Sequence, residues 1–176
     1  MTASRTLLPH DQPVYRFQPM TAHDLEIVRL WLARPHVQEW WGDAPEQFEL
    51  VSGDLSEPDM DQYIVRLGQH PFAYLQCYLC SAYPENGLGL HPPGTRGIDQ
   101  FIGETDLVGR GHGSRFVGAF VEKLLAAGAP RVITDPDPAN ARAIRAYTKA
   151  GFRPVRLADT PDGQALLMIR DNPATR

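Results

Sequence analysis

The sequence predicts a single α+β domain with a mixed, mostly antiparallel central sheet of about seven strands and helices on both faces. The chain has 176 residues, a usual length for one domain with one core. Strand-like runs alternate with runs of helical periodicity, and no repeat, low-complexity segment or linker divides them. A turn at residues 68–71 joins two runs that are expected to pair as an antiparallel hairpin. We therefore expect residues 13–176 to form one domain behind a loose, flexible tail, residues 1–12.

Local signals place the elements in order along the chain. Residues 14–19 alternate between apolar and polar side chains and are expected to form a strand. Thr21 and Asp24 have the spacing of a capping box that opens a helix, and Pro35 ends that helix. The remaining elements are a turn or short helix at 36–42, a helix at 45–55, strands at 63–67, 72–79 and 96–102, a long loop at 81–95, a helix over 116–125, a strand at 129–134, a helix between Asn140 and Gly151, and strands at 152–157 and 165–169, separated by a turn at 161–163.

A glycine-rich segment, residues 108–114, is the most informative part of the chain. It places Gly109, Gly111 and Gly113 at alternate positions directly before a helical stretch. Bare backbone allows several N–H groups to converge, and the helix adds the positive end of its dipole, so the segment predicts a diphosphate site. The spacing fits neither the Walker pattern nor the dinucleotide fingerprint. The alternative is a helix start whose glycines only permit close packing.

A second motif runs from Asn140 to Phe152. Asn140 suits a helix N-cap, Gly151 suits the left-handed position after the helix, and Tyr147 shares one helix face with small residues. The glycine segment and this Asn-x-x-Ala-x-x-x-Tyr-x-x-x-Gly-Phe pattern, in this order and separation, together resemble the GNAT acetyltransferase superfamily. The resemblance implies an acetyl-coenzyme A-dependent N-acetyltransferase that releases coenzyme A.

The same resemblance implies which residues bind the cofactor. Main-chain amides of the glycine segment would hold the pyrophosphate, with Arg110 adding charge, and Asn140 would contact the pantetheine arm. Tyr147 would act as general acid toward the departing thiolate; its alternative is a packed aromatic side chain. Many superfamily members carry Gln or Arg where this chain has Val108, a departure that leaves the amides unchanged. The implied cofactor-binding residues are Ile102, Val108, Gly109, Arg110, Gly111, His112, Gly113, Ser114, Asn140, Ala143 and Tyr147.

Acetyl transfer to an amine also requires a group that takes the ammonium proton. Asp99 is the candidate, because it lies on the expected strand just before the cofactor segment. It could accept the proton directly or through water, or only hold a cationic substrate by charge. A purely structural alternative is an ion pair with Arg96. The oxyanion is expected to meet a backbone N–H near residues 100–102.

The acceptor is implied by a resemblance that extends over residues 15–169. The segments 39–42, 74–78, 96–100, 134–138 and 160–163 resemble aminoglycoside 6′-N-acetyltransferases. This implies a polycationic sugar that reacts by direct attack in a ternary complex. Alternatively, the tryptophans cap the core and Asp135 caps the helix ahead of Asn140. The implied substrate-binding residues are Trp40, Trp41, Gln76, Tyr78, Asp99 and Asp135.

Two other functions stay open. The loop 81–95 carries one carboxylate, Glu85, where the antibiotic-modifying enzymes look rich in acidic and tryptophan residues. The first is an acyltransferase for another amine or hydroxylamine, such as a siderophore precursor. Those enzymes have a Pro-His-Val-x-x-Trp-Trp segment similar to residues 35–41, and His36 would then be a site residue. A non-catalytic acyl-coenzyme A binding module would keep the glycine segment but need neither Asp99 nor Tyr147.

Composition excludes several classes of function. The formal net charge of −4 argues against nucleic-acid binding and suits a cationic small molecule. No apolar run is long enough for a bilayer or a signal peptide, so we expect a cytoplasmic protein without membrane contact. Monomer and homodimer both stay open. Cys77 and Cys80 lie in an expected strand, would point to opposite faces, and are interpreted as small buried hydrophobes, so no metal site is predicted.

Overall fold

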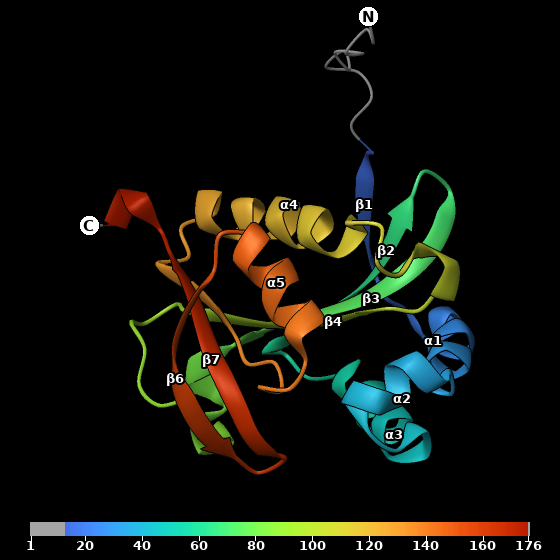
Figure 1. Cartoon of the computed structure of the whole chain (residues 1–176), viewed down its shortest axis with the longest axis horizontal. Coiled ribbons are helices and arrows are strands. Elements are labelled where there is room, and N and C mark those ends of the chain that lie inside the picture. The colour runs from blue at the N-terminus through green and yellow to red at the C-terminus, as the bar shows by residue number, and fades with distance from the viewer. Residues whose placement is uncertain (1–12, 176) are drawn as a thin grey trace, which may run out of the picture.

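The computed structural model describes residues 13–175, so the tail expected at residues 1–12 lies outside the described part (Figure 1). Its centre is one seven-stranded sheet in the order β1-β2-β3-β4-β5-β7-β6, which confirms the expected fold class. All neighbouring strands are antiparallel except β4 and β5. The strands are β1 (Tyr15–Pro19), β2 (Met60–Leu67), β3 (His70–Leu79), β4 (Arg96–Ile102), β5 (Arg131–Thr134), β6 (Arg153–Thr160) and β7 (Gly163–Asp171).

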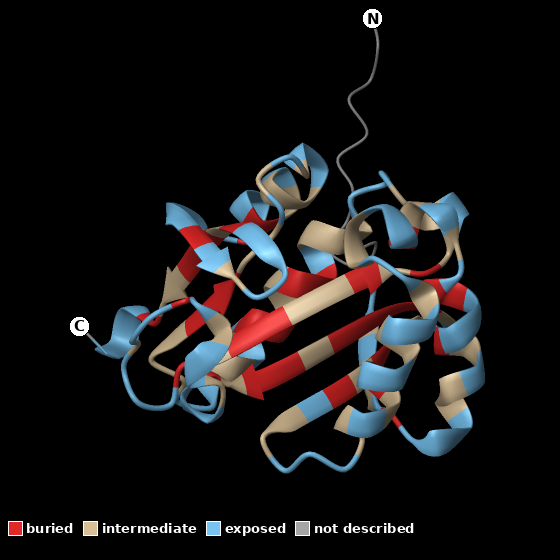
Figure 2. Cartoon of the chain, turned by 90° about the horizontal axis from the view of Figure 1, so that it is seen from below, coloured by how far each residue is buried: buried red, intermediate tan, exposed pale blue. Residues whose placement is uncertain are grey.

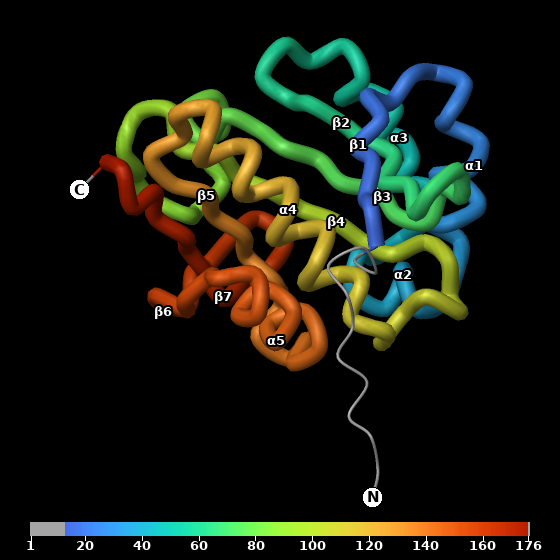
Figure 3. Tube along the Cα trace, turned by 90° about the horizontal axis from the view of Figure 1, so that it is seen from above, coloured from blue at the N-terminus to red at the C-terminus, as the bar shows by residue number. Residues whose placement is uncertain are grey.

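Five α-helices cover the two faces of the sheet (Figures 1 and 3). Alternate residues of a strand separate the two layers: Ile64 and Tyr74 pack with the first three helices, whereas Val65 and Leu75 pack with the last two. Buried residues therefore concentrate along the central strands (Figure 2). The helices are α1 (Leu25–Leu32), α2 (Pro35–Trp41), α3 (Ala44–Asp54), α4 (His112–Ala126) and α5 (Ala141–Lys149). Within the described residues, no helix is both long and apolar enough to cross a membrane.

Local chemistry explains where the first helices begin. The expected capping box is present: the Thr21 amide donates to Asp24 Oδ2 at 2.9 Å, ahead of a short 3-10 turn that leads into α1. Pro35 does more than end that helix, because it occupies the first turn of α2, where its missing N–H costs nothing. The segment expected as a turn or short helix is therefore helical.

The parallel contact between β4 and β5 is short, and this shapes the centre of the molecule. The two strands pair at Arg96–Val132 and Gly97–Ile133. Asp99 and Asp135 each lie two residues beyond the last pair, where the strands separate. The sheet therefore brings two carboxylates to one level on diverging strands.

One detail of the cysteine prediction is wrong. Cys77 lies on β3, but Cys80 begins a 3-10 turn over Cys80–Ala82, so the strand geometry does not relate the two side chains. Both thiols are free and buried, in two different apolar clusters, as expected of small hydrophobes. Burial raises the pKa of each to about 12. Neither thiol is activated as a nucleophile.

Candidate active site

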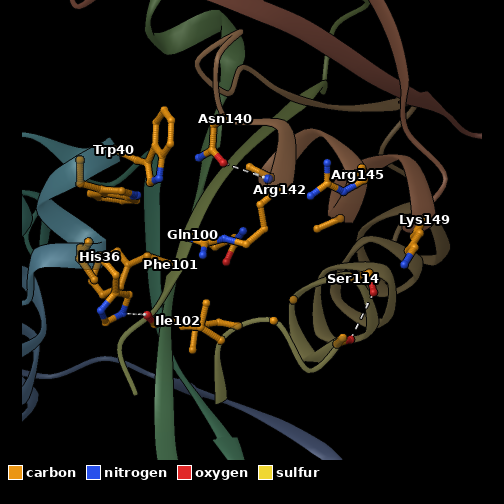
Figure 4. Close-up of a pocket in the computed structure, with 18 residues that line it drawn as sticks. His36, Trp40, Gln100, Phe101, Ile102, Ser114, Asn140, Arg142, Arg145 and Lys149 are labelled. Atoms are coloured by element: carbon orange, nitrogen blue, oxygen red, sulfur yellow. Dashed lines mark hydrogen bonds between the residues drawn. The ribbon is translucent and has the colours of Figure 1, made fainter. Parts of the chain in front are cut away.

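A cavity of about 320 Å³ lies between α2, the end of β4, the glycine segment and α5 (Figure 4). Its lining includes most of the cofactor-binding residues expected from the sequence and the two tryptophans expected to bind the substrate. The expected residues that line it are Trp40, Trp41, Ile102, Val108, Gly109, Gly111, Gly113, Ser114, Asn140 and Ala143. The expected residues outside its lining are Gln76, Tyr78, Asp99, Arg110, His112, Asp135 and Tyr147.

The glycine segment has the backbone geometry that an anion site requires. Gly109 and Gly111 adopt left-handed conformations, with φ of 77° and 80°. A side chain at either position would meet open space or only ordinary contacts, so the requirement for glycine is conformational. Gly111 is also the N-cap of α4, and the first-turn amides that follow have no carbonyl acceptor within the helix. These amides are available to a ligand in the cavity.

Two of the four side chains of this segment, those of His112 and Arg110, do not line the cavity. His112 turns toward the sheet, where its Nδ1 lies 2.8 Å from the Tyr15 hydroxyl and its ring packs edge-on against Phe72. Arg110 is exposed and does not line the cavity. The segment therefore faces the cavity mainly through its backbone and through Ser114.

Helix α5 lies beside the glycine segment, across the cavity from α2, and is capped as expected (Figure 4). Asn140 Oδ1 accepts from the Ala143 amide at 3.0 Å, so Asn140, and not Asp135, is the N-cap. Arg142, Arg145 and Lys149 line the cavity from this helix, and the sequence interpretation missed all three (Figure 4). Their spacing of three and four residues places them on one helix face, a signal that was present in the sequence.

Tyr147 belongs to the same helix. Its ring is buried edge-on against Phe152, at 5.6 Å between centroids, and its hydroxyl accepts a long hydrogen bond of 3.5 Å from Gln100 Nε2. Gln100 itself lines the cavity. Burial raises the pKa of Tyr147, so the hydroxyl keeps its proton at neutral pH. The ring of Tyr147 thus packs in the core, and its protonated hydroxyl lies one side chain away from the cavity.

Asp99 lies on the other face of β4 from Gln100 and is not paired with Arg96. Its Oδ2 accepts from Gln76 Nε2 at 2.9 Å, while Arg96 reaches Asp61 at 3.8 Å. Burial raises the pKa of Asp99, and the hydrogen bond from Gln76 opposes that rise. Asp99 as a whole residue is half-buried.

A third carboxylate joins Asp99 and Asp135. Burial is the main cause of the raised pKa of Asp135, and the nearby charges of Asp99 and Asp162 raise it further. Asp162 belongs to the turn between β6 and β7, and its charge also raises the pKa of Asp99. The sequence interpretation used this turn only as part of the resemblance, because nothing local links it to the other two residues.

The aromatic candidates divide into two groups. Trp40 lines the cavity, as Figure 4 shows, whereas Trp41 combines a cavity surface with core contacts to Phe101 and Tyr74, at 4.8 and 5.9 Å. Tyr78 is buried against Gly97, where any side chain on that glycine would collide with the tyrosine ring. Tyr78 therefore packs beside Asp99 on the same face of the sheet and leaves little surface for a ligand.

His36 lines the cavity but its ring is engaged. Nε2 lies 2.9 Å from the Ile102 carbonyl, and Nδ1 lies 3.4 Å from the Thr105 hydroxyl. These contacts tie α2 to the end of β4. Both ring nitrogens are thus used in holding the wall of the cavity.

Comparisons with known proteins agree with this geometry. Residues 20–160 match the acetyltransferase (GNAT) domain family. The chain is 36% identical over 166 residues to aminoglycoside N(6′)-acetyltransferase type 1 of Klebsiella pneumoniae, covering 88% of this chain and 82% of that protein. It is 43% identical over 83 residues to a kanamycin resistance protein of Rhizobium radiobacter, covering 47% and 77%.

A solved structure is similar over nearly the whole chain. The crystal structure of aminoglycoside acetyltransferase AAC(6′)-Ib with coenzyme A and kanamycin has a TM-score of 0.79 and 34% identity, and the match covers 92% of this chain and 96% of that one. The superfamily resemblance expected from the two motifs is confirmed. With its glycine segment, its capped tyrosine helix and its sheet in the expected arrangement, this chain belongs to the GNAT acetyltransferase family.

Proposed function

We propose that the protein transfers the acetyl group of acetyl-coenzyme A to a primary amine of a polycationic sugar, the 6′-amine of an aminoglycoside. The observation that carries this proposal is the convergence of Asp99, Asp135 and Asp162 where β4 and β5 separate. Asp99 and Asp135 are partly buried and Asp162 is exposed, and carboxylates that repel one another favour a ligand with several ammonium groups. The relatives named for aminoglycoside acetylation and kanamycin resistance support the same class of acceptor.

The cofactor side of the reaction depends on the cavity. The amides at the start of α4 and the glycine segment would bind the pyrophosphate, while Arg142, Arg145 and Lys149 supply positive charge along the same wall. Coenzyme A, which the AAC(6′)-Ib structures contain, is the ligand that this wall would take. The thioester supplies an activated acyl group.

Asp99 would remove the proton from the attacking amine. A general base works best when its pKa approaches the working pH, and burial moves the pKa of this carboxyl in that direction. Tyr147 keeps its proton at neutral pH and would donate it to the departing thiolate. A backbone N–H in residues 100–102 would stabilise the oxyanion. The amine proton thus goes to Asp99 and the phenol proton goes to sulfur.

The hydroxylamine alternative gains no support from His36. In that function His36 would need a free ring nitrogen, but its nitrogens contact the Ile102 carbonyl and the Thr105 hydroxyl. The non-catalytic alternative has no need for Asp99, Asp135 and Asp162 to lie close enough for their charges to interact. Trp40 is half-buried and lines the cavity, where a sugar ring can pack against it.

Thiol release from acetyl-coenzyme A tests the proposal directly. The purified protein is incubated with acetyl-coenzyme A alone, with kanamycin, with tobramycin and with an N-hydroxylated diamine, and the product is located by NMR. We expect turnover only with the antibiotics and an acetyl group on the 6′-nitrogen. Turnover confined to the hydroxylamine, or binding without turnover for every amine, would contradict the proposal.

A further inference from the structure

A row of polar side chains crosses three strands and ends at Asp99. The strand register pairs Gln62 of β2 with Gln76 of β3, and Gln76 with Asp99 of β4. Side chains of paired residues lie on the same face of a sheet, so these three form one line. The line lies on the face covered by α1, α2 and α3, with apolar pairs next to it such as Ile64 and Tyr74.

Four hydrogen bonds of nearly equal length connect this row to the helix above it. Gln62 Nε2 donates to the Val51 carbonyl of α3 and to the Tyr74 hydroxyl, both at 2.9 Å. The Tyr74 hydroxyl donates to Gln76 Oε1 at 2.8 Å. Gln76 Nε2 donates to Asp99 Oδ2 at 2.9 Å.

The direction of every bond follows from the first one. A carbonyl can only accept, so the Val51 carbonyl requires the amide nitrogen of Gln62 on its side. The second hydrogen of that nitrogen goes to Tyr74, whose single proton then goes to Gln76 Oε1. Gln76 is left with its amide nitrogen toward Asp99. A reversed Gln76 would place an oxygen against the carboxylate and leave the Tyr74 proton without an acceptor.

Burial prevents water from relaxing this arrangement. Tyr74 is fully buried and Gln62 is nearly so. Among the described residues, Gln62 Oε1 is buried and has no hydrogen-bond partner. A buried acceptor without a hydrogen-bond partner costs free energy. The fold bears this cost at Gln62 Oε1 because the Val51 carbonyl and the Tyr74 hydroxyl both accept from the nitrogen of the same amide.

We propose that Tyr74 and Gln62 are positioning residues that lock Gln76 as a hydrogen-bond donor to Asp99, which keeps Asp99 ionised and leaves its Oδ1 free for the substrate amine. The proposal rests on the proposed function, in which Asp99 takes the proton. A hydrogen bond donated to a carboxylate favours its charged form and so opposes the effect of burial. Control of the base thus begins at a helix carbonyl three side chains away.

Tyr74→Phe breaks the connection with the loss of one oxygen atom. We expect the midpoint of the Asp99 titration, followed by carboxyl ¹³C NMR and assigned with Asp99→Asn, to rise by about one pH unit. The acidic limb of kcat should move in the same direction, with kcat lower by about tenfold at pH values below the midpoint, by only about twofold near neutral pH, and with KM for acetyl-coenzyme A unchanged. The titratable groups close enough for their charges to interact with Asp99 are Tyr74, Cys77, Tyr78, Cys80, Asp135, Tyr147 and Asp162, of which Cys77 and Tyr147 pack on the opposite face of the sheet.

Two further variants separate positioning from packing. Tyr63→Phe removes a hydroxyl on the opposite face of β2, where the ring packs on Phe120, and should change neither readout. Gln62→Met removes the unsatisfied oxygen but also takes the amide donor from the Val51 carbonyl and the Tyr74 hydroxyl. The two effects on stability oppose each other, so the melting temperature should stay within about 5 °C, while the Asp99 midpoint still rises because the Tyr74 hydroxyl is no longer held in place. A structural role alone would not produce that combination.

The outcomes distinguish this inference from the function on which it rests. An Asp99 midpoint that is the same in wild type, Tyr74→Phe and Gln62→Met overturns the positioning proposal, whatever the activities. A midpoint that rises in a protein that acetylates no aminoglycoside supports the positioning proposal and contradicts the proposed function. Should Tyr74→Phe fail to fold, Gln62→Met alone decides between these results.

Discussion

The two walls of the site are built in different ways. The cofactor wall uses backbone amides of the glycine segment and the cations of α5, which two short stretches of sequence supply. The opposite side uses the carboxylates of Asp99, Asp135 and Asp162, which three separate parts of the sheet bring together. A helix start can hold an anion without any side chain, whereas a polycation requires buried carboxylates that repel one another in its absence. The acceptor side is therefore the costlier one to build.

The largest effect is expected from the acceptor side. Asp99→Asn should lower kcat/KM for an aminoglycoside by about 10²- to 10⁴-fold, because it removes the carboxylate that takes the amine proton in the proposed reaction. Calorimetry should find the affinity for coenzyme A unchanged. A normal kcat with a raised KM for the aminoglycoside in Asp99→Asn would exclude Asp99 as the base and leave it a charge contact only.

Tyr147→Phe probes the junction of the two walls. We expect kcat to fall by about 10- to 100-fold, while the Kd for coenzyme A changes little, because the ring still packs on Phe152. Steady-state kinetics and calorimetry on the same preparation separate the two quantities. Wild-type values for both would reduce Tyr147 to a packing residue.

Gly111→Ala should weaken the cofactor wall alone. A φ of 80° is unfavourable for alanine, so the first-turn amides should shift and the affinity for coenzyme A should fall by about tenfold. The KM for the aminoglycoside should stay near wild type.

Gly128→Ala is the matched control for this variant. Gly128 follows α4 with a φ of 100° and open space around it, so it carries the same conformational cost away from the cavity. Equal losses of coenzyme A affinity in the two variants would show a general effect on α4 instead of a binding loop.

The smallest effect is expected from Asp135→Asn, which should raise the stability of the protein while it weakens the binding of aminoglycosides. The pKa of Asp135 is raised in the folded protein, so the native state binds more protons than the unfolded chain above about pH 4. Stability therefore falls as pH rises through this range, and Asp135→Asn should raise the melting temperature by about 2–4 °C at pH 7. The same variant should bind aminoglycosides more weakly. A lower melting temperature at pH 7 would show that burial and the neighbouring charges do not destabilise the ionised Asp135.

The sequence predicts the cofactor wall better than the acceptor side, and the reason is physical. Asn140 as N-cap and the left-handed Gly111 are local properties, which neighbouring residues determine. The role of Gln76 as donor to Asp99 and the approach of Asp162 depend on strand register and on a distant turn. Trp41, expected at the substrate, also packs against Phe101 in the core. The sequence does not predict this, because a tryptophan in a sequence does not reveal which edge of its ring is buried.

The early end of the β4–β5 pairing also bears on the order in which the two reactants bind. Asp99 belongs to the face of α1, α2 and α3, whereas Gln100 belongs to the face of α4 and α5. An acyl donor and an amine that approach from these opposite faces do not block each other's route. In the proposed reaction, either molecule can therefore enter an enzyme that already holds the other, and double-reciprocal plots should intersect without a compulsory first ligand.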